Sequence, residues 1–180
     1  GDVSHGNKDK LDIIINSLNR IKNHVQDFKF TIVGASKSQY VEVFGDESLS
    51  SITDDYLVFL ERQPHEKVIE KIKNADYTIF LRNNNLSNRA GFPTKLVESL
   101  ACGTPVITNE SSNILDFFVE SETGFLLPSI KNNEIDASLK IILNVSKTHI
   151  VKMKDKSHEF NRFHYEEYFQ DFNFFINNIN

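Results

Sequence analysis

Short apolar runs alternate with segments of helical periodicity along this chain, and this alternation constrains its fold more than any other feature. The runs cover residues 28–34, 56–60, 77–81, 105–108 and 124–128. They are almost wholly apolar, as is typical of parallel strands that are covered on both faces. Between them, apolar residues recur at intervals of three and four, which predicts amphipathic helices. The alternation therefore predicts parallel βαβ units and an α/β fold, with a mostly parallel sheet between two layers of helices.

The predicted helices follow ordinary sequence signals. The first is predicted over residues 8–26, where aliphatic side chains repeat at helical spacing. Pro64 suits the first turn of the next helix, because the amide hydrogen that proline lacks has no acceptor there. Another helix is predicted over residues 93–101, and Ser111 or Ser112 is expected to cap a short one. The last three helices are predicted over residues 134–145, 148–160 and 164–176.

The composition indicates a single domain and argues against several classes of function. A chain of 180 residues can build one hydrophobic core that needs no disulfide or metal to be stable. Its net charge of −5 argues against nucleic acid binding, which normally leaves a basic surface. Cys102 is the only cysteine, so no internal disulfide can form and the cytoplasm is the expected location. There is no apolar run of about 18 residues, and the histidines have no metal-like spacing with one another or with Cys102.

The loop that leads into residues 93–101 combines features of an anion site. Gly91 lets the backbone approach a ligand closely, and a helix that starts near Pro93 exposes the amides of Thr94 and Lys95. Glu98 follows Thr94 by four residues, so it shares a helix face with it. A carboxylate there could accept hydrogen bonds from the two hydroxyls of a ribose whose phosphate sits at the helix start. The alternative is an ordinary solvated helix start, with Lys95 and Glu98 as a surface pair.

Two stretches carry a family resemblance: AGFPTKLVESLACGTPVIT, residues 90–108, and VESETGFLLP, residues 119–128. Together they resemble the donor-binding region of glycosyltransferase family 4, whose members are retaining sugar transferases of the GT-B fold. The resemblance covers about residues 76–128, with weaker similarity over residues 1–34. It implies a Rossmann-like three-layer sandwich that ends in C-terminal helices. Residues 1–180 would then be a single donor-binding domain, the C-terminal half of a GT-B enzyme whose N-terminal acceptor domain is absent from this chain.

The resemblance also assigns roles to individual residues. Glu98 matches the glutamate that holds the ribose hydroxyls, and the loop and helix start match the part that faces the diphosphate and the sugar. Ala90 replaces the family's first glutamate, which tends to contact the transferred sugar, so no catalytic residue is assigned. The donor-binding residues assigned by position are Gly91, Phe92, Thr94, Lys95 and Glu98.

Two further cations are candidates for the diphosphate. The stretch before the first helix resembles a family loop in which a lysine usually meets the diphosphate, and Lys8 is the first choice, with Lys10 in reserve. Arg82 follows the third apolar run, at the ligand end of the predicted sheet, where a guanidinium could clamp phosphate with paired donors. Arg89 is its alternative. Each of these side chains could equally be solvated and without a role.

The implied activity is transfer of a sugar from a nucleotide diphosphate to a glycan or lipid-linked acceptor, in bacterial polysaccharide, capsule or lipopolysaccharide synthesis. The resemblance implies retention of configuration and no required metal or other cofactor. The chain alone is expected to bind the nucleotide sugar without turning it over. Two alternatives stay open: a GT-B-like nucleotide-sugar epimerase, and a non-catalytic binding or scaffold module, which Ala90 favours. Peripheral membrane association of the full enzyme, at the cytoplasmic face, is also left open.

The two ends of the chain raise separate questions. Residues 164–176 are rich in Phe and Tyr, and packing against the protein itself is favoured over a membrane surface because the polar face is acidic. Without the partner domain, part of this face could be exposed and drive dimerisation. In the resembling fold a central strand precedes the first helix, and here only residues 1–3 could serve. A missing strand would leave its neighbours with unpaired backbone groups. Upstream residues, this short piece or another chain could supply it.

Overall fold

The computed structural model describes residues 8–45, 49, 56–160, 163 and 165–178. Its first helix is α1 (Leu11–Ile21), which continues into a 3-10 turn, η1 (Lys22–His24). One stripe of α1 is buried, as the aliphatic spacing predicts. The helix begins three residues later than expected because Lys10 adopts a left-handed backbone conformation, with φ of 53°. Lys8 therefore lies in the turn before α1 and not on the helix.

The first sheet has two parallel strands. They are β1 (Phe30–Val33) and β2 (Leu57–Leu60), and Phe30 lies opposite Leu57. Between them lies α2 (Lys37–Phe44), which the sequence analysis did not predict. Ser36 caps this helix by accepting a hydrogen bond from the amide of Gln39, whose side chain accepts one from the Ser36 amide. Such a reciprocal capping box starts a helix even where the apolar pattern is weak.

The second sheet has three parallel strands in the order β3-β4-β5. The strands are β3 (Thr78–Ile79), β4 (Val106–Asn109) and β5 (Gly124–Leu127). The helices that precede or link them are α4 (His65–Asn74), α5 (Leu86–Arg89), α6 (Thr94–Ala101) and the 3-10 turn η2 (Ile114–Phe117). The expected cap by Ser111 or Ser112 is wrong, since η2 is a 3-10 turn with Asn113 at its start and no side-chain cap.

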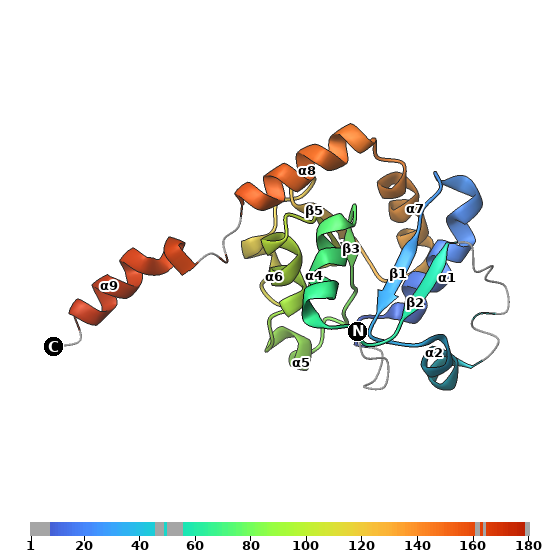
Figure 1. Cartoon of the computed structure of the whole chain (residues 1–180), viewed down its shortest axis with the longest axis horizontal. Helices are drawn as coiled ribbons and strands as arrows, with labels where there is room; N and C mark the ends of the chain where they lie inside the picture. The colour runs from blue at the N-terminus through green and yellow to red at the C-terminus, as the bar shows by residue number, and fades with distance from the viewer. Residues whose placement is uncertain (1–7, 46–48, 50–55, 161–162, 164, 179–180) are drawn as a thin grey trace.

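Helices cover both faces of the strands, which confirms the predicted α/β fold with parallel strands. The chain ends with α7 (Asn132–Leu143), α8 (Lys147–Glu159), η3 (Tyr165–Tyr168) and α9 (Phe169–Asn177). Figure 1 shows α1 and α7 together beside β1 and β2, and α4 and α6 together beside β3. Along β4 the side chains alternate between the layers: Ile107 packs in the core with α1 and α7, and Val106 packs in the core with α6.

The expectation that the C-terminal aromatic segment packs against the protein is wrong in this structure. Figure 1 shows α9 extending away from the body of the molecule. Phe172, Phe174 and Phe175 are 60%, 72% and 62% exposed. The face is aromatic, as the sequence indicates, but the described part of the domain offers no surface against it. Within that part, no helix has both the length and the apolar character needed to cross a membrane.

Candidate functional site

Three of the residues that the sequence analysis selected line one end of the same cavity. The cavity has a volume of about 970 Å³, and Lys8, Lys95 and Glu98 are among its lining residues. Lys95 and Glu98 come from the first turns of α6, and Lys8 comes from the turn before α1. This end lies beyond the carboxyl end of β3, where parallel α/β sheets usually bind ligands.

Asp9 joins the cationic side chains at this end of the cavity. Its carboxylate lies 2.7 Å from Lys95 Nζ and 3.6 Å from Arg82 Nε. Its backbone carbonyl accepts a hydrogen bond of 3.2 Å from the amide of Leu81. One acidic side chain thus holds together two cationic side chains, Lys95 and Arg82, that are candidates for binding phosphate. The sequence analysis missed Asp9, because nothing in the local sequence distinguishes it from a solvated aspartate between two lysines.

Arg82 is a buried cation whose hydrogen bonding is incomplete. The residue is only 6% exposed. Its backbone is held by Asn109, the last residue of β4. The Arg82 amide donates to Asn109 Oδ1 and the Arg82 carbonyl accepts from Asn109 Nδ2, both at 2.8 Å. Among the described residues, neither the buried Nε of Arg82 nor the buried Oδ1 of Asp9 has a hydrogen-bond partner. Such atoms need an explanation, and an anionic ligand at this point would supply one for the guanidinium.

The start of α6 presents backbone amides to the same region. Pro93 is buried and precedes the helix, and its carbonyl accepts a hydrogen bond of 2.9 Å from the amide of Leu96. The amides of Thr94 and Lys95 belong to the first turn, where no intrahelical acceptor exists. The positive end of the α6 helix dipole lies at these amides, and it adds to the charge of the Lys95 ammonium.

Arg82 and the other predicted residues lie outside the cavity lining, although Arg82 contacts the lining residue Asp9. Gly91 and Thr94 are exposed, and the Phe92 ring packs against Phe117 and Phe163 at centroid distances of 5.0 and 5.7 Å. Phe92 therefore anchors the loop before α6 instead of facing the cavity. The alternative cation Arg89 is exposed at the end of α5, which leaves Arg82 as the better-placed guanidinium.

The second motif of the resemblance has a structural role here. Thr123 Oγ1 accepts a hydrogen bond from the Val119 amide at 2.9 Å, which closes the turn before β5. A Cβ built on Gly124 would lie 1.9 Å from the Val106 carbonyl oxygen, so only glycine lets β5 approach β4 this closely. Glu120 accepts a hydrogen bond from the Leu126 amide at 2.9 Å. This motif fixes the edge of the sheet and does not contribute to the cavity.

Two other chemistries find little support among the described residues. No group of three or more histidine, cysteine or carboxylate side chains in that part of the chain could hold a metal ion. Burial raises the pKa of the Cys102 thiol, and the nearby Glu98 carboxylate raises it further, although Lys73 opposes both. A thiol with a raised pKa is a poor nucleophile at neutral pH.

Comparison with known proteins identifies the family. The family described as Glycosyl transferases group 1 matches residues 6–159, which is most of the chain. The chain belongs to this family. A curated relative, the capsular polysaccharide biosynthesis glycosyltransferase CapM of Staphylococcus aureus, is 25% identical over 124 residues. That match covers 67% of this chain and 32% of CapM, so the matched region spans about a third of the length of its relative.

Solved structures show the same fold at low sequence identity. The C-terminal domain of the group 1 glycosyl transferase LpcC from Francisella tularensis has a TM-score of 0.69 and 12% identity, over 88% of this chain and 80% of that one. HepE from Anabaena in complex with UDP has a TM-score of 0.73 and 13% identity, over 95% of this chain and 46% of that one. HepE has also been solved with UDP-glucose, with a TM-score of 0.70 to this chain. This chain therefore has the fold of GT-B C-terminal domains.

Proposed function

We propose that this group 1 glycosyltransferase chain is the donor-binding half of a retaining enzyme of family 4. It would bind a nucleotide-diphosphate sugar for transfer to a glycan or lipid-linked acceptor in the synthesis of a surface polysaccharide. The observation that carries the proposal is the convergence of Lys95 and the buried Arg82 on one point at the start of α6. The UDP and UDP-glucose complexes of HepE support a nucleotide sugar as the ligand class.

The chemistry of such a site is stabilisation of a leaving group. As the glycosidic bond to the diphosphate breaks, negative charge builds up on the departing phosphate oxygens. The Lys95 ammonium, the Arg82 guanidinium and the free amides of α6 would neutralise that charge, with Lys8 at the rim of the cavity. Glu98 would accept hydrogen bonds from the ribose hydroxyls, one helical turn along the same helix. The acceptor and the remaining catalytic groups would come from an N-terminal domain outside this chain, in the cytoplasm.

Calorimetric titration with UDP, UDP-glucose, GDP and inorganic pyrophosphate tests these assignments one by one. Lys95→Met should weaken UDP and pyrophosphate alike, by about tenfold or about 1.4 kcal/mol. Glu98→Gln should weaken UDP by a similar factor but leave pyrophosphate unchanged, because pyrophosphate has no ribose. Lys152→Met, on the exposed face of α8, is the matched control and should change neither. Equal loss of UDP and pyrophosphate binding in Glu98→Gln would contradict the ribose assignment.

A non-catalytic binding module is the second candidate, because Ala90 stands where the family's first glutamate is found. Both candidates require nucleotide binding, so they differ only in turnover once the acceptor domain is present. A complete enzyme should release UDP from a UDP-sugar in an acceptor-dependent reaction, and proton NMR of the product should show the donor's anomeric configuration. The epimerase alternative receives no support, since no described residue that lines the cavity is a histidine.

A further inference from the structure

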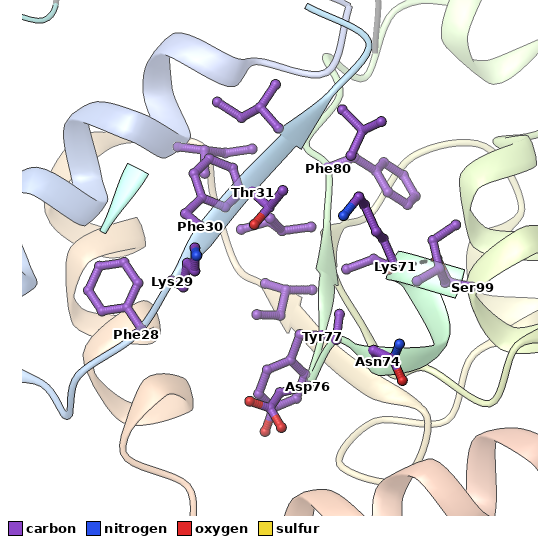
Figure 2. Close-up of a pocket in the computed structure, with 18 of the residues that line it drawn as sticks. Phe28, Lys29, Phe30, Thr31, Lys71, Asn74, Asp76, Tyr77, Phe80 and Ser99 are labelled. Atoms are coloured by element: carbon purple, nitrogen blue, oxygen red, sulfur yellow. Dashed lines mark hydrogen bonds between the residues drawn. The ribbon is translucent and has the colours of Figure 1, made fainter. Parts of the chain in front are cut away.

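The helix α6 lines the cavity with one face and packs into the hydrophobic core with another. Lys95, Glu98 and Ser99 are among the residues that line the cavity, and Figure 2 shows Ser99 among the side chains around it. Leu96 and Leu100 are fully buried, and they belong to a core cluster on a different side of the helix. Any shift of α6 on its core contacts therefore also moves the side chains that line the cavity.

Direct contacts fix the middle and the end of α6. Thr78 of β3 donates a hydrogen bond of 2.7 Å from its hydroxyl to the hydroxyl of Ser99. Gly103, just after the helix, lies against α8, since a Cβ built on it would be 3.4 Å from the Lys154 carbonyl oxygen and from His158 Cβ. Neither contact reaches the first turn of α6, so the position of that turn must be set by other residues.

Aromatic packing holds the first turn of α6. Within the described part of the chain, no side chain caps the helix at Pro93, and Gly91 in the loop before it is exposed. Phe92 lies between these two residues and is half-buried, with its ring against Phe117 and Phe163. Because a loop that contains glycine has few conformational restraints of its own, the Phe92 ring determines where the first turn lies.

Phe163 reaches this aromatic cluster from a distant part of the chain, between α8 and η3. Its ring stacks on Phe117 with a centroid distance of 5.0 Å and an interplanar angle of 16°, and it lies 5.7 Å from the Phe92 ring. All three rings pack against the core cluster that contains Leu96 of α6. The family match ends at residue 159, so membership of the family assigns no role to Phe163.

We propose that Phe163 is a positioning residue for the diphosphate site, an inference that rests on the proposed function. Phe163 is not among the residues that line the cavity, so it acts through Phe92 and not by touching the ligand. By fixing the first turn of α6, it holds the free amides of Thr94 and Lys95 in one geometry before a ligand arrives. A site that is ordered in advance binds more tightly, because less conformational freedom is lost on binding.

Calorimetry with UDP and with inorganic pyrophosphate tests this role. Phe163→Ala should weaken both ligands by about fivefold to tenfold, since both meet the first turn of α6. Phe163→Tyr keeps the ring and should restore the affinity of the wild type for both. Phe44→Ala is the matched control, because it removes a half-buried ring that lies 4.6 Å from the Tyr40 ring on α2, and it should change neither affinity. Wild-type affinity for both ligands in Phe163→Ala would overturn the proposal.

A double-mutant cycle tests whether Phe163 acts through Phe92. If it does, Phe163→Ala should have no further effect on pyrophosphate affinity in a chain that already carries Phe92→Ala. A purely structural role would instead lower stability in both backgrounds and leave the affinity of the folded chain unchanged. Losses of affinity that add in the double variant would show that Phe163 acts by another route, and would overturn the assignment.

Hydrogen exchange in the ligand-free chain separates this inference from the proposed function. The Leu96 amide donates to the Pro93 carbonyl at 2.9 Å, so its exchange reports on the first turn of α6. Phe163→Ala should speed this exchange by about tenfold, whereas Phe44→Ala should leave it unchanged. Phe163→Leu, which loses the ring but less volume, should show the same direction and decides the matter if the alanine variant does not fold.

The two possible failures give different results. A wild-type chain that binds neither UDP nor pyrophosphate would contradict the proposed function, even where Leu96 exchange is faster in Phe163→Ala. Leu96 exchange that is equal in the wild type, Phe163→Ala and Phe163→Leu would overturn the role of Phe163, even where UDP binds.

Discussion

At Asp9, one carboxylate faces two cations that the proposed ligand would also need. Lys95 Nζ lies 2.7 Å from it and Arg82 Nε lies 3.6 Å from it. A diphosphate that takes these cations must displace Asp9 or bind beside it, and two anions at one point repel each other. On the proposal that a diphosphate binds here, Asp9 would therefore compete with it for Lys95 and Arg82. At the same time it keeps a buried guanidinium from being an isolated charge.

Asp9→Asn should therefore tighten UDP binding. Removing the negative charge frees Lys95 and Arg82 for the phosphates while the amide keeps the size of the side chain. We expect the Kd for UDP to fall by about threefold to tenfold, which corresponds to about 0.7–1.4 kcal/mol. Calorimetry at two salt concentrations measures this, and Asp155→Asn on the exposed face of α8 is the control. Weaker binding in Asp9→Asn alone would mean that the carboxylate positions the cations instead of competing for them.

The sequence could predict part of this site because some of its signals are local. Lys95 and Glu98 are three residues apart on one helix, so their proximity follows from helical geometry. Asp9 could not be found in this way, since 86 residues separate it from Lys95. Arg82 was selected for its place after a strand, but its backbone is held by hydrogen bonds with Asn109, which is 27 residues away and which the sequence does not connect to it. The roles of all these residues in donor binding stay predictions.

At the scale of elements, the strands were predictable and the connections less so. Parallel strands buried by two helical layers must be apolar throughout, so each of the five runs marks a strand within a few residues. The helix α2 was missed because Tyr40 is its only buried residue, although Ser36 and Gln39 have the capping-box spacing. The packing of α9 was predicted wrongly, because an apolar face in a sequence does not say which surface covers it.

The contact between β4 and β5 gives a prediction about stability. Gly124 has φ of +154°, and an added Cβ would meet the Val106 carbonyl oxygen at 1.9 Å. Since backbone must move to admit it, Gly124→Ala should destabilise the fold by about 3 kcal/mol. Gly45→Ala is the matched control, because Gly45 has φ of +83° but no atom within 4 Å of the added Cβ. The control should lose less, about 1–2 kcal/mol, because it carries the backbone strain without the clash. Urea unfolding measures both, and equal losses would refute the steric explanation.

The link between α1 and α7 gives a prediction about pH. Burial alone would raise the pKa of Asp136, but hydrogen bonds from Arg20 and Ser17 outweigh it and lower the pKa below its usual value. Asp136→Asn should therefore cost stability at pH 7, by about 1 kcal/mol, because Arg20 is partly exposed and the pair is screened by solvent. A lowered folded-state pKa contributes stability that is present above about pH 4 and is lost as the pH falls through the folded-state value.

Urea unfolding of both proteins at pH 7 and pH 3 measures this effect. The difference in unfolding free energy between the wild type and Asp136→Asn should shrink at pH 3, because protonation of Asp136 removes the same interaction that the substitution removes. Asp155→Asn should show no difference at either pH, since Asp155 is exposed on α8. A difference that is unchanged between the two pH values would show that the charge of Asp136 does not contribute.

At the scale of the whole molecule, the candidate site lies where the two sheets meet. Lys8 and Asp9 lead into α1, which packs with β1 and β2, whereas Arg82 and Lys95 belong to the segments around β3, β4 and α6. The ion pairs of Asp9 and its hydrogen bond with Leu81 therefore connect the part of the domain around α1 with the part around β3 and α6. A diphosphate that binds Lys8, Lys95 and Arg82 together would add further contacts between the same two parts.

Nucleotide binding should consequently stabilise α1 as well as α6. With UDP at about a hundred times its Kd, the added stability is about 2.7 kcal/mol for structure that opens only when the ligand leaves. We expect hydrogen exchange of the α1 amides, such as those of Ile14 and Ile15, to slow by about tenfold to a hundredfold. Lys95→Met should lose this protection at the same UDP concentration, and Lys152→Met should keep it. Protection confined to α6 would show that UDP touches only the β3 side, because a ligand that bridges both parts cannot leave α1 free to open.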